Sequence, residues 1–259
     1  MFKTTTLILA LSAVAFPVIA AENPFTGTWK LNQGKSDLKG QTFTIASLGD
    51  NKFRFTYGSA VDFTVKADGT DQATFPGATW AITIKDPNTW DMVYKTNGTK
   101  TGTATWTLAP DGKSSTNKFK GIRPDGSESE STATSKRVSG SGGFAGTWQS
   151  TDVSLSNVSL MQIEASPNGG LAVSWPSDKV SMKVTLDGKE FAVEGPTVIK
   201  GSTSSAKEMG SHAMRMTDKL NGKVMDTADW KVSPDGKLLT ITEHDAGVKK
   251  ATVTVYDRQ

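Results

Sequence analysis

Ionisable side chains that could take part in catalysis are few in this 259-residue chain. It has two histidines, His212 and His244, and the second stands between the carboxylates Glu243 and Asp245. A serine hydrolase needs a serine, a histidine and an acid within hydrogen-bond reach of one another, and the G-x-S-x-G pattern of a nucleophile elbow does not occur. Two isolated histidines also lack the ligand spacing of a metal site. The sequence predicts neither a catalytic histidine nor a bound metal.

Paired carboxylates are the next candidates for chemistry. Glu128 and Glu130 share a strand face within the run Ser-Glu-Ser-Glu-Ser-Thr, whose polar neighbours indicate a solvated edge. Acid/base catalysis requires two carboxyl groups at a set separation, and nothing in this run indicates one. No glycine run precedes a helix, so a phosphate-binding loop is not supported. We therefore predict a protein that is not an enzyme and has no cofactor.

The composition narrows the choice of partners. The chain has 29 basic and 26 acidic side chains, a balance that gives no electrostatic case for binding nucleic acid or an anionic membrane surface. It contains no cysteine, so disulfides and thiolate chemistry are unavailable and stability must come from buried cores.

The first residues have the pattern of a secretory signal peptide. Lys3 precedes an apolar run over residues 7–16, and the small residues Ala20 and Ala21 follow it. The run is too short for a membrane-spanning helix, which needs about 20 apolar residues. We expect residues 1–20 to be removed by cleavage after Ala20 or Ala21. The mature protein would then be periplasmic or extracellular.

An internal repeat is the most specific signal in the chain. Phe25-Thr-Gly-Thr-Trp29 recurs as Phe144-Ala-Gly-Thr-Trp148, at an offset of 119 residues. Further along, Trp106 and Pro110-Asp-Gly-Lys113 reappear at an offset of 124 residues. Such a fixed period usually means that one structural unit is repeated. We predict units over residues 24–138 and 144–259, joined by the Ser-Gly-Ser-Gly-Gly run at 139–143 as a flexible linker.

Apolar residues alternate with polar ones within each unit. Runs such as Phe53-Arg-Phe-Thr-Tyr57 and Leu171-Ala-Val-Ser-Trp175 have the period of half-buried strands, and Asp-Gly and Asn-Gly pairs between such runs indicate tight turns. We predict an all-β protein of two tandem antiparallel up-and-down β-barrels with 8–10 strands each, because closure removes the edges of such a sheet. The strands are short and their alternate residues polar, including Arg54 and Lys183, so we expect no membrane span.

The first and last strands of these units resemble those of a known family. Phe25-Thr-Gly-Thr-Trp-Lys-Leu31 and Val255-Tyr-Asp-Arg258 are similar to the opening and closing strands of fatty-acid-binding proteins, and Gly-x-Trp is also the lipocalin signature. Both groups belong to the calycin superfamily. A closer resemblance is to secreted lipocalin-like proteins of soil bacteria, which begin with Gly-Thr-Trp-Lys-Leu-Asn and a Lys-Ser pair, as Gly27–Asn32 and Lys35-Ser36 do here.

The calycin resemblance implies a structural role for these signature residues. A tryptophan would plug the closed end of each barrel, and an arginine would stack on it through cation–π attraction. The matching positions are Gly27, Trp29, Arg137, Gly146, Trp148 and Arg258. Two family features are missing: the segment 33–40 is too short for a helical lid, and Thr254 replaces the arginine that binds a fatty-acid carboxylate.

The barrel interior is the predicted binding site. Aromatic and methionine side chains suit small apolar ligands. The candidates in the first unit are Phe53, Phe55, Trp80 and Trp90, and those in the second are Trp175, Met182, Met214, Met216, Trp230 and Tyr256. The bulky residues of the first unit predict a filled core, so we expect the pocket chiefly in the second.

Two functions follow from these features. The first is non-covalent carriage of a small apolar molecule within a β-barrel. The alternative is an envelope or extracellular interaction or structural module with filled barrels, whose partner would be a protein.

Overall fold

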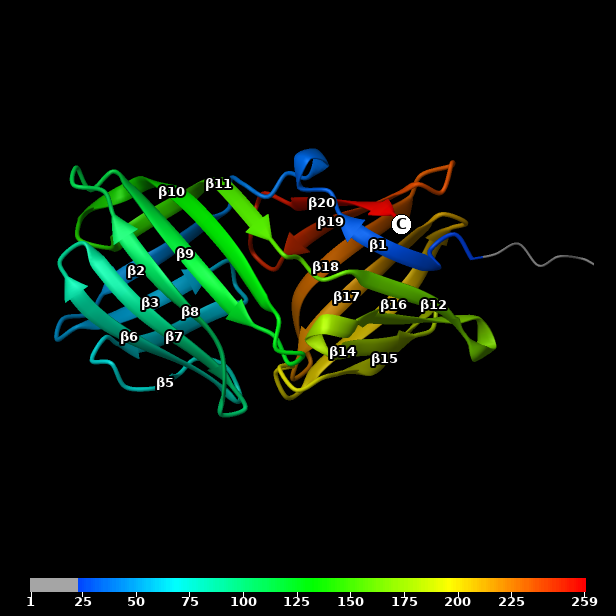
Figure 1. The fold of residues 1–259 in the computed structure, drawn as a ribbon, viewed down its shortest axis with the longest axis horizontal. Coiled ribbons are helices and arrows are strands. Elements are labelled where there is room, and N and C mark those ends of the chain that lie inside the picture. Colours follow the sequence, from blue (N-terminus) through cyan, green and yellow to red (C-terminus); the bar gives the residue numbers. More distant parts are fainter. Residues whose placement is uncertain (1–22) are drawn as a thin grey trace, which may run out of the picture.

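The computed structural model describes residues 23–259, and the predicted signal peptide lies outside this range. The described chain is built of antiparallel strands joined by tight turns and three short 3-10 turns, at Gln33–Lys35, Pro167–Gly169 and Pro176–Asp178 (Figure 1). The strands form two ten-stranded sheets, one a closed barrel and the other nearly closed. The predicted all-β class and the two antiparallel barrels are confirmed, and the architecture is compatible with a calycin-like fold.

The nearly closed sheet, called the first barrel, follows the order β4-β3-β2-β11-β10-β9-β8-β7-β6-β5. Its strands are β2 (Thr42–Ser47), β3 (Lys52–Tyr57), β4 (Val61–Lys66), β5 (Gln72–Ala73), β6 (Ala78–Asp86), β7 (Thr89–Thr96), β8 (Thr99–Leu108), β9 (Ser114–Ile122), β10 (Glu128–Gly142) and β11 (Ala145–Ser156).

The closed sheet, called the second barrel, follows the order β1-β12-β13-β14-β15-β16-β17-β18-β19-β20, and β20 pairs with β1 to close it. Its strands are β1 (Gly27–Leu31), β12 (Met161–Ser166), β13 (Gly170–Trp175), β14 (Val180–Val184), β15 (Asp187–Glu194), β16 (Ser202–Gly210), β17 (Ala213–Leu220), β18 (Lys223–Val232), β19 (Leu238–Asp245) and β20 (Thr252–Arg258).

The two units exchange their first strands. The strand β1 lies among the orange and red strands of the second barrel in Figure 1, paired with β12 and β20. The strand β11 occupies the corresponding place in the first barrel, between β2 and β10. The barrels therefore do not follow the predicted boundaries at 24–138 and 144–259, because each contains one strand from the other half of the repeat.

The segment 139–143, predicted to be a flexible linker, is part of a β-hairpin. Ser139 pairs with Thr147 and Gly142 pairs with Ala145 across β10 and β11. Gly140 has a φ of +88°, and a Cβ there would lie 2.7 Å from the Cα of Gly146, so only glycine fits this close approach. The tight turn directs β11 back along β10, which places it in the first barrel.

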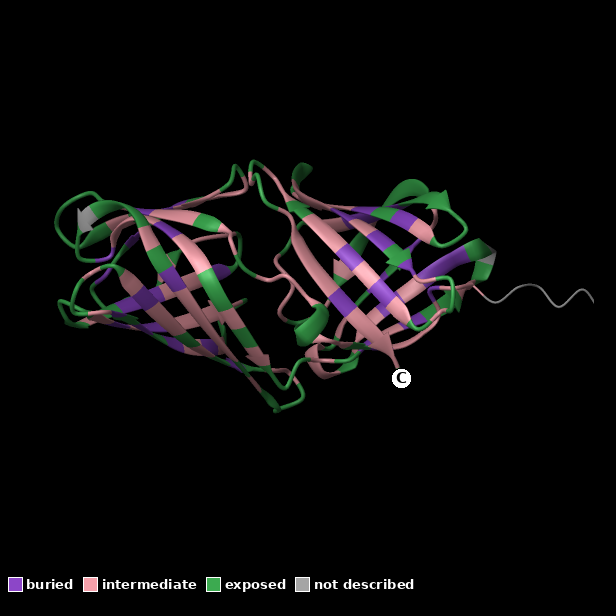
Figure 2. Ribbon diagram, turned by 90° about the horizontal axis from the view of Figure 1, so that it is seen from above, coloured by how far each residue is buried: buried purple, intermediate pink, exposed green. Residues whose placement is uncertain are grey.

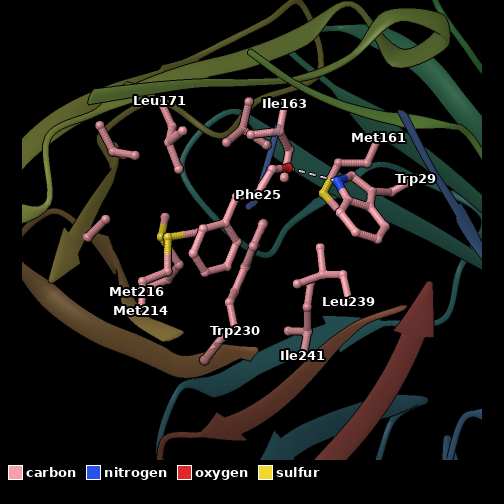
Figure 3. Packing of buried hydrophobic residues seen from close by; sticks show 14 of the residues in the cluster. Phe25, Trp29, Met161, Ile163, Leu171, Met214, Met216, Trp230, Leu239 and Ile241 are labelled. Carbon is pink, nitrogen blue, oxygen red and sulfur yellow. Dashed lines mark hydrogen bonds between the residues drawn. The ribbon is translucent and has the colours of Figure 1, made fainter. Parts of the chain in front are cut away.

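Each barrel has its own apolar core, and the alternation of buried and exposed residues along the strands is visible in Figure 2. The core of the second barrel contains Trp29 from β1 together with residues such as Met161, Leu171 and Leu239 (Figure 3). The core of the first barrel contains Trp148 from β11. The exchanged strands thus supply a fully buried tryptophan to each core.

The barrels meet at the strand ends that lie opposite these tryptophans. At this junction, Tyr57 at the end of β3 donates to Asp245 Oδ2 at the end of β19 over 2.5 Å. Arg123 Nε lies 3.1 Å from Asp178 Oδ1. Trp29 pairs with Arg258 at the end of β20 that lies away from this junction. The open ends of the two barrels, which we call their mouths, therefore face each other, and the ends that contain the tryptophans lie outermost.

Candidate functional site

A tryptophan and an arginine close the outer end of each barrel. The Arg258 guanidinium carbon lies 4.3 Å from the ring centroid of Trp29, and that of Arg137 lies 4.2 Å from the ring centroid of Trp148. Each tryptophan Nε1 donates to a main-chain carbonyl four residues earlier, over 2.9 Å, and Figure 3 shows this bond for Trp29. The arginine of each barrel therefore stacks on the exchanged tryptophan rather than on the one in its own repeat.

The glycines of the Gly-x-Trp motif make room for these arginines. A Cβ at Gly27 would lie 2.7 Å from Arg258 Nη1, and one at Gly146 would lie 2.8 Å from Arg137 Nη1. The guanidinium of Arg137 donates to three carbonyl oxygens, including that of Gly112 over 2.6 Å and that of Ala145 over 2.6 Å. Arg258 likewise donates to three main-chain carbonyl oxygens, so both arginines tie neighbouring loops to the closed end of a barrel.

The first barrel contains a cavity of about 320 Å³ near its mouth. Half of its lining residues are aromatic, and several of the rings pack edge to face: Phe63 and Trp80 have centroids 4.8 Å apart, and Trp80 and Tyr94 have centroids 5.1 Å apart. The lining residues are Phe43, Thr44, Phe55, Thr56, Tyr57, Val61, Phe63, Trp80, Met92, Tyr94, Trp106, Asn117, Ala133 and Ser135. The expectation that the bulky side chains fill this barrel is wrong, because many of them pack on one another around the space.

The candidates of the first unit divide between wall and core. Phe55 and Trp80 line the cavity. Phe53 and Trp90 pack against each other with centroids 4.7 Å apart, and Trp90 also stacks on Phe144 at 4.2 Å. Phe53 and Trp90 thus belong to the packing around the closed end, where Phe144 and Trp148 lie.

The second barrel has a cavity of about 390 Å³ at its mouth. Trp175 and Met182 line it, together with Phe75, which comes from the loop after β5 of the first barrel. The other second-unit candidates lie elsewhere. Met214, Met216 and Trp230 are buried in the core shown in Figure 3. Tyr256 lines a further space of about 380 Å³, which residues of both barrels enclose.

The mouth of the second barrel differs from that of the first in charge. Asp218, Asp226 and Asp245 are direct cross-strand neighbours on β17, β18 and β19, and we call these three residues the acidic row. Burial, with the charge of Asp218 next in effect, raises the pKa of Asp226 to about 7. Burial and the charge of Asp245 raise the pKa of Glu243 to about 7. Within residues 23–259, no three such side chains are placed to hold a metal ion.

The equivalent row of the first barrel is uncharged. Tyr94, Gly102 and Gly121 pair across β7, β8 and β9 in the same register as the acidic row. The ring of Phe119 covers both glycines, since a Cβ at Gly102 would lie 2.6 Å from it and one at Gly121 would lie 3.0 Å from it. The repeat therefore has a carboxylate-lined mouth in one copy and an aromatic mouth in the other.

The groups considered first for catalysis are not brought together. His212 and His244 are exposed, and Nδ1 of His212 lies 3.1 Å from the hydroxyl of its neighbour Ser211. Glu128 forms an exposed ion pair with Lys120 over 2.8 Å. Glu130 instead borders the space between the barrels.

Sequence reasoning missed several residues of the cavity walls. Asn117 and Ser135 are polar residues at inward positions of β9 and β10, and Phe75 lies in a loop without strand periodicity. The alternation Ser115, Asn117, Phe119 could have placed Asn117 on the inner face, because Phe119 has the same parity. Nothing local to Phe75 indicates that it reaches the other barrel.

Comparison of the chain with known protein families, with curated proteins and with solved structures finds no match. None of the helical segments in residues 23–259 has the length and apolar character needed to cross a membrane.

Proposed function

We propose that this chain is an exported, lipocalin-like binding protein that holds a small apolar molecule without covalent chemistry inside a β-barrel. The observation that carries this proposal is the aromatic cavity of the first barrel. Ligand sites are concave and mostly apolar, with a few polar groups that orient the ligand, and this cavity has that composition.

The size of the cavities favours a binder over a module with filled barrels. Ligand pockets have volumes of roughly 300–1,000 Å³. The cavities of about 320 and 390 Å³ lie at the lower end of this range and therefore suit a small molecule.

Two further observations support the lipocalin-like and exported parts of the proposal. The Phe-x-Gly-Thr-Trp motif lies on the strand that closes the second barrel, and its tryptophan stacks with a closing arginine as the resemblance implies. The first 21 residues have the charge and hydropathy pattern of a signal peptide.

The direct test is to extract natively purified protein with organic solvent and identify the extract by mass spectrometry. We expect a stoichiometric apolar compound. Purified protein should also bind at least one member of a panel of retinoids, fatty acids and quinones, with quenching of tryptophan fluorescence, because Trp80 and Trp106 line the cavity.

A cavity-filling variant tests whether the ligand binds in the cavity of the first barrel. Ala133→Phe places a ring in the first cavity and should weaken binding at least tenfold, whereas Thr107→Phe adds the same ring to the exposed face of β8 and should leave binding unchanged. Near-ultraviolet circular dichroism confirms that both variants fold. An extract without a bound compound, together with no binding of any panel member, would refute the proposal. Unchanged binding by Ala133→Phe would show that the binding site does not lie in the first barrel.

A further inference from the structure

The wall of the first cavity has no charged side chain. Its lining residues include no aspartate, glutamate, lysine, arginine or histidine, and its only titratable groups are Tyr57 and Tyr94. The corresponding end of the second barrel has Asp218 and Asp226 in its cavity wall. The acidic row and its counterpart in the first barrel share one cross-strand register, so this contrast arises from the side chains at matching positions.

Polar groups are also present in the wall of the first cavity. The Tyr94 hydroxyl lies 3.4 Å from Met92 Sδ, a weak acceptor, and within hydrogen-bonding reach of the Asn117 side chain. Burial raises the pKa of Tyr94, so its hydroxyl keeps its proton and remains a donor at neutral pH. Asn117 adds an amide to the same wall.

A second polar position lies on β10. Ser135 lines the cavity and is 5% exposed, and its cross-strand neighbour Ser115 is 2% exposed. Among residues 23–259, no partner lies within hydrogen-bond distance of Ser115 Oγ. Ser115 does not line the cavity, so Ser135 is the residue of this pair that offers a hydroxyl to a bound molecule, beside Tyr94 and Asn117 in the same wall.

We propose that the first-barrel cavity selects an uncharged aromatic molecule bearing one hydroxyl or carbonyl group, and that it rejects amines and carboxylates of the same shape. This inference rests on the proposed binding function. The aromatic walls can pack edge to face on a flat ring. An ion in this cavity would lose its hydration and meet no opposite charge, which disfavours binding strongly.

Four naphthalene compounds of similar size test this selectivity: 1-naphthylmethanol, 1-methylnaphthalene, 1-naphthylmethylammonium and 1-naphthylacetate. Calorimetry at pH 7 measures the binding of the alcohol, and displacement of the alcohol measures competition by the two ions at the same site. We expect each ion to compete at least 30-fold less well than the alcohol. A smaller difference for either ion overturns the inference.

Two substitutions at one position test the roles of charge and hydroxyl. Tyr94→Asp gives the first cavity the residue found at the equivalent place in the second, and should make the ammonium compound bind better than the alcohol. Tyr94→Phe removes only the hydroxyl. It should weaken binding of the alcohol about fivefold and leave binding of 1-methylnaphthalene unchanged. The matched control is Asp218→Asn in the second barrel, which should not alter binding of the alcohol.

The remaining outcomes separate this inference from the function on which it rests. If Tyr94→Asp does not fold, Tyr94→Phe decides, and equal losses for both neutral compounds overturn the inference. If none of the four compounds binds but the native extract contains an aliphatic or charged molecule, the inference fails and the binding function stands. If neither the extract nor any compound shows binding, both fail.

Discussion

Single side chains at the facing mouths set the electrostatic difference between the barrels. Asp226 lies between its cross-strand neighbours Asp218 and Asp245. All three residues lie at the end of the second barrel that faces the first barrel. The hydroxyl of Tyr57, from the other barrel, donates to Asp245. The other acids share a partly buried region, so desolvation and mutual repulsion favour their protonated forms.

The raised pKa values predict stability that declines as the pH rises. The folded protein keeps protons on Asp226 and Glu243 up to about pH 7, whereas the unfolded chain releases them near pH 4. The folded state therefore binds more protons between these limits, and the free energy of unfolding falls across that window and levels off above it. Allowing for partial exposure, we expect a loss of about 1–2 kcal/mol between pH 5 and pH 8 in urea titrations.

Asp226→Asn removes one of these two titrating groups. The free energy of unfolding should then fall with pH about half as steeply as in the natural protein. The control is Asp50→Asn, at an exposed turn position with a φ of +49° that asparagine tolerates, and it should keep the slope of the natural protein. Two results would contradict the raised pKa values: an unchanged dependence of the free energy of unfolding on pH in Asp226→Asn, or a stability that rises with pH.

At the scale of the strands, the exchange of β1 and β11 determines how each barrel is completed. The strand β1 leaves the second barrel at Leu31, and the chain then crosses to β2 of the first. The strand β11 ends at Ser156, and the chain crosses back to β12. Each barrel therefore includes a strand that reaches it from the other half of the repeat, between β2 and β10 in the first and between β12 and β20 in the second.

Removal of β1 should open the second barrel more than the first. In a chain that begins at Gln33, hydrogen exchange measured by mass spectrometry should show a larger loss of protection in β12 and β20, which β1 bridges, than in β2 and β10. A synthetic peptide of residues 23–32 should restore protection, and the same peptide with Trp29→Ala should not. A larger loss of protection in β2 and β10 than in β12 and β20 would mean that β1 belongs to the first barrel.

Much of this architecture could be predicted from the sequence, but the exchange could not. Alternation such as Phe53-Arg-Phe and turns such as Asn97-Gly98 are local signals, so strands and class follow from them. The motifs at Gly27 and Gly146 are nearly identical, so the motif does not indicate which barrel each strand joins, whereas the hairpin at Gly140 places β11 beside β10. The cavity was missed because composition shows how bulky the inward residues are but not how their rings pack.

The whole molecule is two barrels held mouth to mouth by polar contacts. The amide nitrogen Nδ2 of Asn97 donates to the carbonyl oxygen of Pro196 over 3.1 Å, and Gln41 Nε2 donates to Thr252 Oγ1 over 2.5 Å. Together with the two crossing segments, these contacts couple the barrels. We therefore expect the barrels to unfold together.

Core truncations in either barrel test this coupling. Leu171 and Ile82 are fully buried in the second and first barrel, and replacing either with alanine should lower the free energy of unfolding by about 2–5 kcal/mol. Exchange by global unfolding should then accelerate in both barrels for either variant, with a single urea transition. Thr107→Ala, on the exposed face of β8, serves as the control. Acceleration confined to the altered barrel would show that they unfold separately.

The exchanged strand also affects how the nascent chain matures. Thr26 and Arg258, which are hydrogen-bonded to each other, lie 232 positions apart, so the second barrel cannot seal until the ribosome has made the last residues. Synthesis at roughly 5–20 residues per second leaves β1 without its partner β20 for ten seconds or more. For a protein exported as we propose, this delay keeps the leading segment extended while a translocation channel engages it, so the barrel seals only after the whole chain has crossed.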